Sequence, residues 1–342
     1  MREDGRGTEL IEGLAGRALG WARARRALEA MELPASLADA PGGPRASRAQ
    51  VAYALFLVLA EDLLDRVPTA RAYVEDLAGE GRRLVLDHGA VRTVLGPSGA
   101  LPPGEAALAR ILGPLGYAPA ETYPLDRLAM TGRAWRHQDL PADVPQYFLS
   151  EFHPERFGAA FRAASERVLS GSRDPLPPRA LAALERLGGE GSLPLEEAAA
   201  LLPDLAACFG RQHPAPALAD HRILAESSAE MAWIATEGNA FNHATDRVPD
   251  VEALSRTQRD LGRPIKDAVE VSASGRVLQT AFLADPVVRA FRGPGGRAVL
   301  ETVPGSFFEF ITRRPLPGGG LDLGFDTGNA QAIFRMTAPG VR

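Results

Sequence analysis

The 342-residue chain has a single cysteine, no strong excess of either charge and no long apolar run. Because Cys208 stands alone, an intrachain disulfide, a CxxC redox pair and a thiolate zinc cluster are all excluded. Any bound metal must therefore use histidine, aspartate or glutamate. The net charge of −5, with basic residues spread along the chain, argues against a nucleic-acid partner.

Signals for a membrane or for export are also missing. The longest apolar run, residues 51–60, is about half of the roughly 20 residues that a membrane helix needs. The first residues, MREDGRGTEL, are acidic where a signal peptide is basic, and no apolar segment follows them. We therefore expect a cytoplasmic enzyme that acts on a small molecule and contacts no membrane. No oligomeric state is indicated.

The N-terminal region has the periodicity of helices. Apolar residues recur at three- and four-residue spacing over residues 8–31 and 48–66. Ser47 is a suitable N-cap for the second segment, and Gln50 completes a capping box. We predict that residues 1–80 form a helical region.

The rest of the chain alternates between strand and helix patterns, which predicts an α+β protein. The β-branched LVLDHGAVRTVLG opens residues 81–145, the first part of a β-sheet domain that also contains a helix near 103–115. Residues 146–235, beginning with QYFLSEF, are predicted to be a helical insertion. Residues 236–342 form the second part of the sheet domain, with strands expected at FNHATDRV, AVEVSASGRVLQTAFLA, RAVLETV, SFFEFITRR and LDLGF.

In the first predicted strand, His88 and Arg92 share one face because both lie at even positions. Their Cα atoms are then about 13 Å apart, near the span of a small dicarboxylate held between a metal and an extended guanidinium. The alternative is a surface strand with a hydrogen-bonded histidine and a solvated arginine.

The FNHATDRV segment offers a second histidine. Alternation places Phe241, His243 and Thr245 on one face of the strand and Asn242 on the other. His243 is then either a metal ligand or a buried histidine with its hydrogen bonds satisfied.

A carboxylate stands among large apolar residues in GSFFEFITRR. Phe307, Glu309 and Ile311 lie on one face of that predicted strand. An ionised carboxylate in such surroundings needs a cation or metal, or else takes up a proton. Arg313 or Arg314 is the alternative partner if the strand is exposed.

Two imidazoles and one carboxylate form the facial triad of non-haem iron(II) oxygenases, which leaves coordination sites for substrate and O2. The chain has six histidines and 43 acidic residues, so spacing alone does not select one triple. The other four histidines are interpreted as structural or surface residues. No GxSxG, P-loop, HExxH or dinucleotide-binding glycine pattern is present, which disfavours hydrolases and nucleotide-binding enzymes.

Five ordered segments resemble one known family. DHGAVRTV, QYFLSEFHPERF, FNHATDRV, RVLQTAF and GSFFEFITRR, within about residues 50–335, are similar to the 2-oxoadipate dioxygenase/decarboxylases, also called D-2-hydroxyglutarate synthases. The resemblance implies a vicinal oxygen chelate-like fold. In such a fold a curved mixed β-sheet surrounds the metal site, and the N-terminal and central helical regions are additions to it.

The resemblance also assigns roles to residues. It implies that His88, His243 and Glu309 bind iron(II), and that Arg92 binds the substrate. Gln279, on the LQTAF strand, is a candidate pocket residue, although a polar residue facing solvent is an equal alternative.

A C-terminal segment is implied to hold substrate as well. Its counterpart here is DTGNAQAIF, which places Gly328 and Asn329 beside the substrate. At this point the sequence departs from the long-form enzymes, which carry a Val-Ser pair.

The implied reaction combines a 2-oxo acid with O2 and needs no separate cosubstrate. With 2-oxoadipate the products are 2-hydroxyglutarate and CO2. Two alternatives stay open: a related iron oxygenase that acts on another 2-oxo acid, and a non-catalytic metal-binding protein of the same fold.

Overall fold

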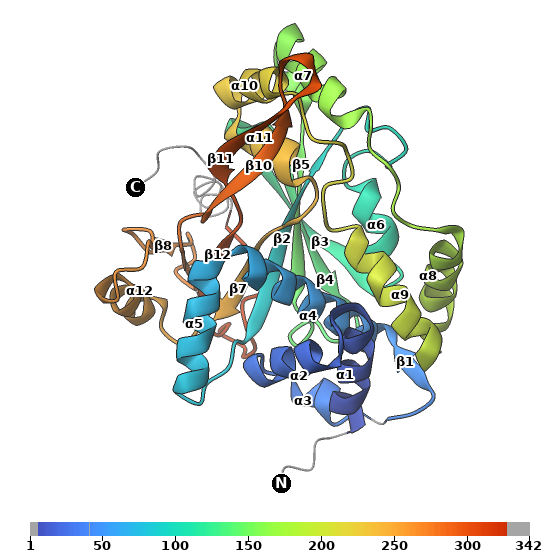
Figure 1. The fold of residues 1–342 in the computed structure, drawn as a ribbon. Coiled ribbons are helices and arrows are strands. Elements are labelled where there is room, and N and C mark those ends of the chain that lie inside the picture. The colour runs from blue at the N-terminus through green and yellow to red at the C-terminus, as the bar shows by residue number, and fades with distance from the viewer. Residues whose placement is uncertain (1–5, 41, 327–342) are drawn as a thin grey trace.

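The computed structural model describes residues 6–40 and 42–326. A mixed sheet of eight strands lies at its centre and curls into a half-barrel, with helices packed around it (Figure 1). In spatial order the strands are β3 (Tyr117–Leu125), β4 (Met130–His137), β5 (Gln146–Phe152), β2 (Leu86–Val94), β7 (Phe241–Arg247), β12 (Phe307–Arg313), β9 (Val277–Ala281) and β8 (Glu270–Val271). Only β2 with β5 and β7 with β12 run parallel; the other neighbours are antiparallel.

The sheet consists of two halves with the same topology. In each half the first strand lies at the centre, the next two form the outer strands, and the last returns to pair in parallel with the first. The two first strands, β2 and β7, meet as antiparallel neighbours. A repeat that the sequence does not reveal is therefore present in the fold.

Two groups of helices surround this sheet, one before its first strand and one inserted between β5 and β7. The N-terminal group is α1 (Arg6–Leu19), α2 (Trp21–Ala30), α3 (Ala35–Ala38), α4 (Arg48–Arg66) and α5 (Pro68–Gly79). Between β5 and β7 lie α7 (Ala159–Leu169), α8 (Pro178–Glu190), α9 (Leu195–Ala207), α10 (Leu218–Ser227) and α11 (Ala229–Glu237). The remaining helices are α6 (Ala106–Leu112), α12 (Val251–Asp260) and single turns at Asp126–Leu128, Pro154–Arg156 and Pro294–Gly296.

Two small antiparallel ribbons stand apart from the main sheet. One pairs β1 (Arg45–Ser47) with β6 (Ser192–Pro194), and the other pairs β10 (Pro286–Arg292) with β11 (Ala298–Pro304). The first ribbon ties the start of α4 to the start of α9. The strand at β10 is not predicted from the sequence.

The N-terminal helices follow the sequence pattern closely. Ser47 and Gln50 form the expected reciprocal capping box at the start of α4. The single helix expected over residues 8–31 is divided at Gly20, whose φ of 83° is a conformation that glycine adopts without strain.

Helix α4 covers one face of the sheet and forms the main core with it. The Phe56 ring of α4 lies 5.4 Å from Tyr147 on β5 and 5.2 Å from Phe241 on β7, both edge to face. Ala90 and Phe148 point to the other face, where they join a second cluster and line a pocket. The sheet thus separates the main apolar core from the pocket.

Two of the expected elements are wrong. The QYFLSEF segment, predicted to open a helical insertion, is the strand β5, and helix begins beyond it with α7. Because β5 is buried along its whole length, its sequence has no two-residue alternation to mark it as a strand. LDLGF at residues 321–325 is not a strand either; only an isolated bridge joins Leu321 to Pro315.

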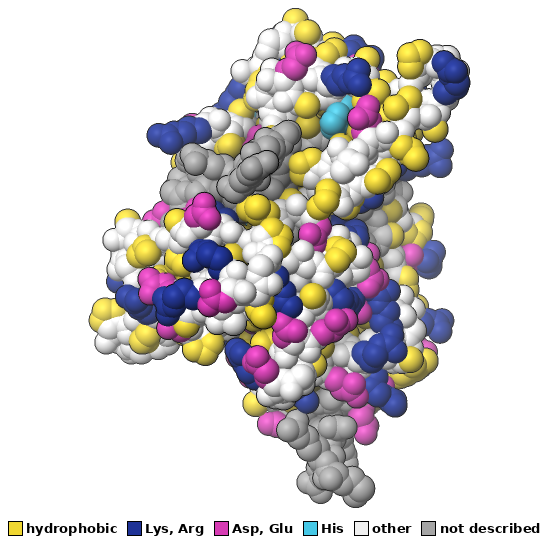
Figure 2. Space-filling view, turned by 60° about the vertical axis from the view of Figure 1, so that its left-hand side comes forward, with side chains coloured by type: hydrophobic (Ala, Val, Ile, Leu, Met, Phe, Trp, Pro, Cys, Tyr) yellow, Lys and Arg dark blue, Asp and Glu magenta, His cyan; other side chains and the backbone are white. Residues whose placement is uncertain are grey.

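Charged side chains of both signs are mixed on the surface. On the face shown in Figure 2, acidic and basic side chains are interspersed rather than gathered by sign. Among residues 6–40 and 42–326, every helix falls short of the length and apolar character needed to span a bilayer.

Gly89 on β2 provides a test of the packing between sheet and helix. A Cβ at this position would lie 1.9 Å from Cζ of Phe241, so Gly89→Ala must displace the ring that packs on α4. We expect the free energy of unfolding in urea to fall by about 1–3 kcal/mol. Gly79→Ala at the end of α5, where a Cβ meets nothing within 4 Å, is the control and should be neutral or slightly stabilising. Equal stability of the two variants would contradict this packing.

Candidate metal centre

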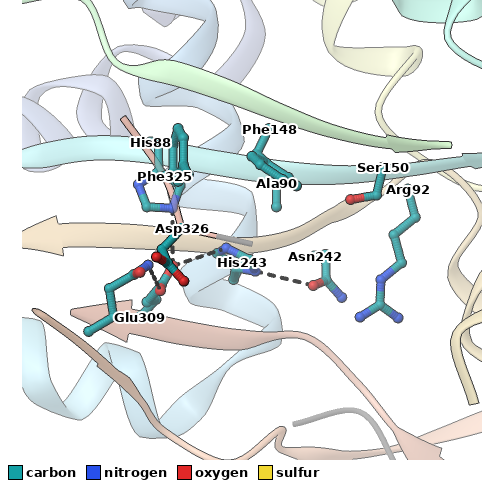
Figure 3. A pocket seen from close by; sticks show the side chains of 11 residues that line it. His88, Ala90, Arg92, Phe148, Ser150, Asn242, His243, Glu309, Phe325 and Asp326 are labelled. Carbon is teal, nitrogen blue, oxygen red and sulfur yellow. Dashed lines mark hydrogen bonds and ion pairs between the residues drawn. The ribbon is translucent and has the colours of Figure 1, made fainter. Parts of the chain in front are cut away.

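Three side chains from three neighbouring strands converge in the pocket (Figure 3). His88 comes from β2, His243 from β7 and Glu309 from β12, and all three are buried. Oε2 of Glu309 lies 3.1 Å from Nε2 of His88 and 3.2 Å from Nε2 of His243. Their donor atoms all lie within 4.8 Å of one another, and no other such group is found among the described residues.

The two distances from Glu309 to the histidines fit the ligands of a single metal ion. Ligand atoms bound at about 2.1 Å and at right angles to each other lie about 3 Å apart. A set of two imidazoles and one carboxylate suits iron(II) and other divalent transition metals and leaves further coordination positions open. The site is therefore chemically able to hold a metal that also binds substrate.

Both imidazoles are oriented by the residue that precedes them in the sequence. Nδ1 of His88 lies 2.8 Å from Oδ1 of Asp87, and Nδ1 of His243 lies 3.2 Å from Oδ1 of Asn242. An acceptor at Nδ1 fixes the tautomer that leaves Nε2 free for a metal. The paired DH and NH dipeptides are the sequence signal for these two acceptors, and our sequence analysis missed it.

Asp87 is itself held by a buried arginine. Arg313 on β12 donates to both oxygens of Asp87 at 2.8–3.1 Å, and both side chains are buried. Burial works to raise the pKa of Asp87, but Arg313 and His88 outweigh it and hold that pKa well below its usual range. Arg313 thus pairs with Asp87 instead of Glu309, and Arg314 donates to a backbone carbonyl oxygen of Gly275.

Several hydrogen-bond donors stabilise the negative charge of Glu309. The Thr245 hydroxyl donates to Oε2 at 2.8 Å, and Nε2 of Gln279 donates to Oε1 at 2.6 Å. Burial works to raise the pKa of Glu309, but hydrogen bonds and charge from the two imidazoles outweigh it and keep that pKa far below its usual range. The carboxylate is therefore ionised although Phe307 and Ile311 flank it, which is one of the two states that the sequence left open.

The triad lies at one end of the pocket and Arg92 at the other (Figure 3). The pocket and its opening together contain about 430 Å³ of space not filled by atoms, part of it open to solvent. Arg92 is buried, and its guanidinium carbon stands 4.9 Å from the centre of the Trp233 ring. Gln279 also lines the pocket, and the rest of its wall consists of Ala90, Phe148, Ser150, Asn242, Phe325 and Asp326.

A β-bulge changes the expected facing of the FNHATDRV strand. His243 lies opposite Ala90, while Phe241 lies opposite the very next residue of β2, so Asn242 is an extra residue in the pairing. Phe241 consequently packs in the core and does not share a face with His243, and Asn242 faces the pocket. The expected grouping of Phe241 with His243 is wrong for this reason.

The segment 322–325 crosses beside the pocket and forms part of its wall. Arg313 donates to two of its carbonyl oxygens at 2.7 and 2.8 Å, and Arg136 on β4 donates to a third. The Phe325 ring consequently sits 4.8 Å from the ring of His88. Gly328 and Asn329, expected beside the substrate, lie outside the described residues.

The repeated topology relates the ligands to one another. In the antiparallel pairing of β2 and β7, His88 lies opposite Thr245, two positions after His243. In the same way, His243 lies opposite Ala90, two positions after His88. Exchanging the two halves therefore brings His88 onto His243. Glu309 pairs with Thr245, two positions after His243. In the first half, Phe148 pairs with Ala90, two positions after His88, so Phe148 takes the place that matches Glu309. Three of four related positions thus carry the residues of the triad, and an aromatic ring takes the fourth.

Solved structures share this architecture. A protein from Ralstonia eutropha JMP134 that its name assigns to the glyoxalase superfamily is 54% identical, with a TM-score of 0.90 over 94% of this chain and 99% of that chain. The hydroxyglutarate synthase from Oryza sativa, in complex with 2-oxoadipate, is 22% identical, with a TM-score of 0.67 over 88% and 97% of the two chains. Its Pseudomonas putida counterpart, also with 2-oxoadipate, is 20% identical, with a TM-score of 0.58 over 86% and 74%. The expected vicinal oxygen chelate-like α+β fold is confirmed.

A comparison with curated proteins finds no match. A family model does match, over residues 51–319, which include every strand of the curled sheet and all three residues of the triad. The resemblance inferred from the five sequence segments is therefore confirmed: the chain belongs to the 2-oxoadipate dioxygenase/decarboxylase family.

Proposed function

We propose that the protein is an iron(II)-dependent dioxygenase and decarboxylase that converts 2-oxoadipate and O2 into 2-hydroxyglutarate and CO2. One observation carries the proposal: a buried triad of two histidines and a glutamate faces a buried arginine along a single pocket. Family membership supports an enzyme of this class. The 2-oxoadipate bound to the rice and Pseudomonas putida synthases supports the substrate.

Iron(II) suits the donor set, and when bound it would supply the redox chemistry that couples O2 to oxidative decarboxylation of a 2-oxo acid. The chain's own contribution is to keep the ligands in their binding forms. Asp87 and Asn242 contact Nδ1 of the two histidines, so that Nε2 of each is the atom that would bind the metal, and the ionised Glu309 supplies negative charge.

Arg92 is proposed to bind the carboxylate that lies farthest from the metal. Four strand residues separate it from His88, which spaces the two Cα atoms by about 13 Å. A dicarboxylic 2-oxo acid held at both ends loses its freedom to rotate, so its reacting end stays in place beside the metal.

Aromatic side chains limit the access of water to the reacting end. Phe148 and Phe325 line the pocket beside His88, with their ring centres 5.1 Å apart. A dry wall strengthens the electrostatic contacts inside the pocket and protects reactive species from water.

These same rings favour a second candidate, a 2-oxo acid with an aromatic or aliphatic tail. Such a substrate needs no cation at the far end of the pocket. Arg92 therefore distinguishes the two candidates.

Removal of any ligand should abolish metal binding. We expect His88→Ala, His243→Ala and Glu309→Ala each to lose iron in an anaerobic titration and to lose O2 uptake with 2-oxoadipate. The wild type should bind one iron per chain. His221→Ala, which changes a histidine outside the triad, is the control and should retain both properties. Stoichiometric iron in a triad variant, or an iron-loaded wild type without O2 uptake, would refute the assignment.

Gln279 should support metal binding indirectly, through Glu309. Gln279→Leu keeps the side-chain volume but removes the donor to Oε1, and we expect iron affinity to fall about 10- to 100-fold. Gln258→Leu, at a buried glutamine on α12, is the matched control and should bind iron as the wild type does. Equal iron affinity in the two variants would show that Gln279 plays no such part.

Arg92 should set the preference for a dicarboxylate. We expect Arg92→Met to raise KM for 2-oxoadipate about 100-fold or more, because it removes a charge-assisted contact. Arg92→Lys keeps the positive charge but lacks the planar guanidinium, so its KM for 2-oxoadipate should lie between those of the wild type and Arg92→Met. O2 uptake with phenylpyruvate that exceeds uptake with 2-oxoadipate in the wild type, and that survives Arg92→Met, would favour the second candidate.

A further inference from the structure

Two polar side chains in the pocket have atoms with no hydrogen-bond partner among the described residues. They are Oγ of Ser150 and Nδ2 of Asn242, and the residues are only 1% and 2% exposed. Buried polar groups nearly always have a partner, because desolvation without one is costly. Both residues line the cavity between the triad and Arg92, so both atoms are available to a bound ligand.

The orientation of Asn242 follows from its contact with the metal ligand. Its carbonyl oxygen lies 3.2 Å from Nδ1 of His243. A histidine that binds metal through Nε2 carries its proton on Nδ1 and donates it, so the atom facing Nδ1 must be the acceptor oxygen. The amide nitrogen is then the opposite end of the side chain. Figure 3 shows Asn242 between His243 and Arg92.

Ser150 adds a hydroxyl at the same end of the pocket. It lies directly opposite Arg92 in the parallel pairing of β5 with β2, and Figure 3 shows the two side chains as neighbours. Ser150 and Asn242 come from two different strands, β5 and β7, and in Figure 3 the Arg92 side chain starts beside Ser150 and extends toward Asn242.

The chemistry of this group selects a carboxylate. A guanidinium and an amide nitrogen only donate hydrogen bonds, and a hydroxyl can donate as well, while a carboxylate offers about four lone pairs that only accept. Burial lowers the pKa of Arg92 to about 10 against the opposing charge of Glu230, so a bound anion would favour its charged form. A neutral ligand would supply acceptors but would bring no charge opposite to that of the guanidinium.

We infer that Arg92, Ser150 and Asn242 form one donor set for the distal carboxylate of a dicarboxylic 2-oxo acid, with Asn242 as a specificity-determining residue. The inference rests on the proposed function and extends its distal site from one residue to three. Because the two ends of Asn242 face His243 and the carboxylate, this side chain joins substrate selection to metal ligation.

The experiment compares two ligands that differ only at the distal end. Dissociation constants of 2-oxoadipate and of 2-oxohexanoate, which ends in a methyl group, are measured without O2 on cobalt(II)-loaded protein from the change in its visible spectrum. The ratio of the two constants reports recognition of the distal carboxylate and does not depend on turnover. Cobalt(II) affinity is measured separately for each variant.

Substitutions at Ser150 and at Asn242 should change the binding constants in different ways. Ser150→Ala should reduce the preference for 2-oxoadipate about tenfold, and Asn242→Asp, which places a like charge beside the carboxylate, about 100-fold. Binding of 2-oxohexanoate should change less than about threefold in both, as expected for contacts that it does not make. Asn242→Asp should keep its cobalt(II) affinity because its carboxylate still accepts from His243. Asn242→Leu lacks that acceptor and should lose about 10- to 100-fold in cobalt(II) affinity.

Ser165→Ala, at a buried serine outside the pocket, is the matched control and should leave the ratio unchanged. A wild-type preference for 2-oxoadipate that persists undiminished in Ser150→Ala and Asn242→Asp would overturn the inference and leave the proposed function standing. If Asn242→Asp does not fold, Ser150→Ala alone decides. A wild type that binds both ligands equally would instead overturn the dicarboxylate function, and the inference with it.

Discussion

The negative charge of Glu309 is the constraint on which the pocket depends. A carboxylate that is 1% exposed and flanked by Phe307 and Ile311 stays ionised only if cationic or donor groups surround it. Two imidazoles, a hydroxyl and an amide meet this need, and they come from three strands, β2, β7 and β9. The folded sheet is what brings them together, so the charge is tolerated only in the native arrangement.

From this charge the interactions extend outward through Asp87 to Arg313. The same guanidinium that holds Asp87 against His88 also donates to the backbone of residues 322–325. A ligand of the proposed metal and a wall of the proposed substrate pocket are therefore fixed by one buried cation. Loss of Arg313 would therefore disturb both, because removing one partner of a buried ion pair leaves an uncompensated charge and the backbone of residues 322–325 would lose its donor.

Much of the metal centre can be predicted from the sequence, and the reason is strand alternation. Alternation alone places His88 with Arg92 and identifies Glu309 as a carboxylate in need of a partner, although family resemblance is needed to select the triple. Alternation gives the wrong facing around Asn242 because a β-bulge lies there. The bulge arises from the pairing of β7 with β2, so the sequence of β7 alone does not indicate it. β5 is missed because both of its faces are buried. The wall at residues 322–325 is missed because side-chain contacts to its backbone, from Arg313 and from the distant Arg136, hold it in place, and no sequence pattern marks them.

The aromatic residue at the fourth related position has a consequence for how the two halves divide their work. Zinc sites with four protein ligands serve structural purposes, whereas catalytic sites have three and leave a position for an exchangeable molecule. Phe148 stands where a strictly symmetric duplicate would place a second glutamate. The two halves therefore contribute unequally: the second supplies His243 and Glu309, whereas the first supplies only His88 and has an aromatic ring in place of the carboxylate. In such a scaffold, an open coordination position for substrate would result from this one difference between the halves, at Phe148.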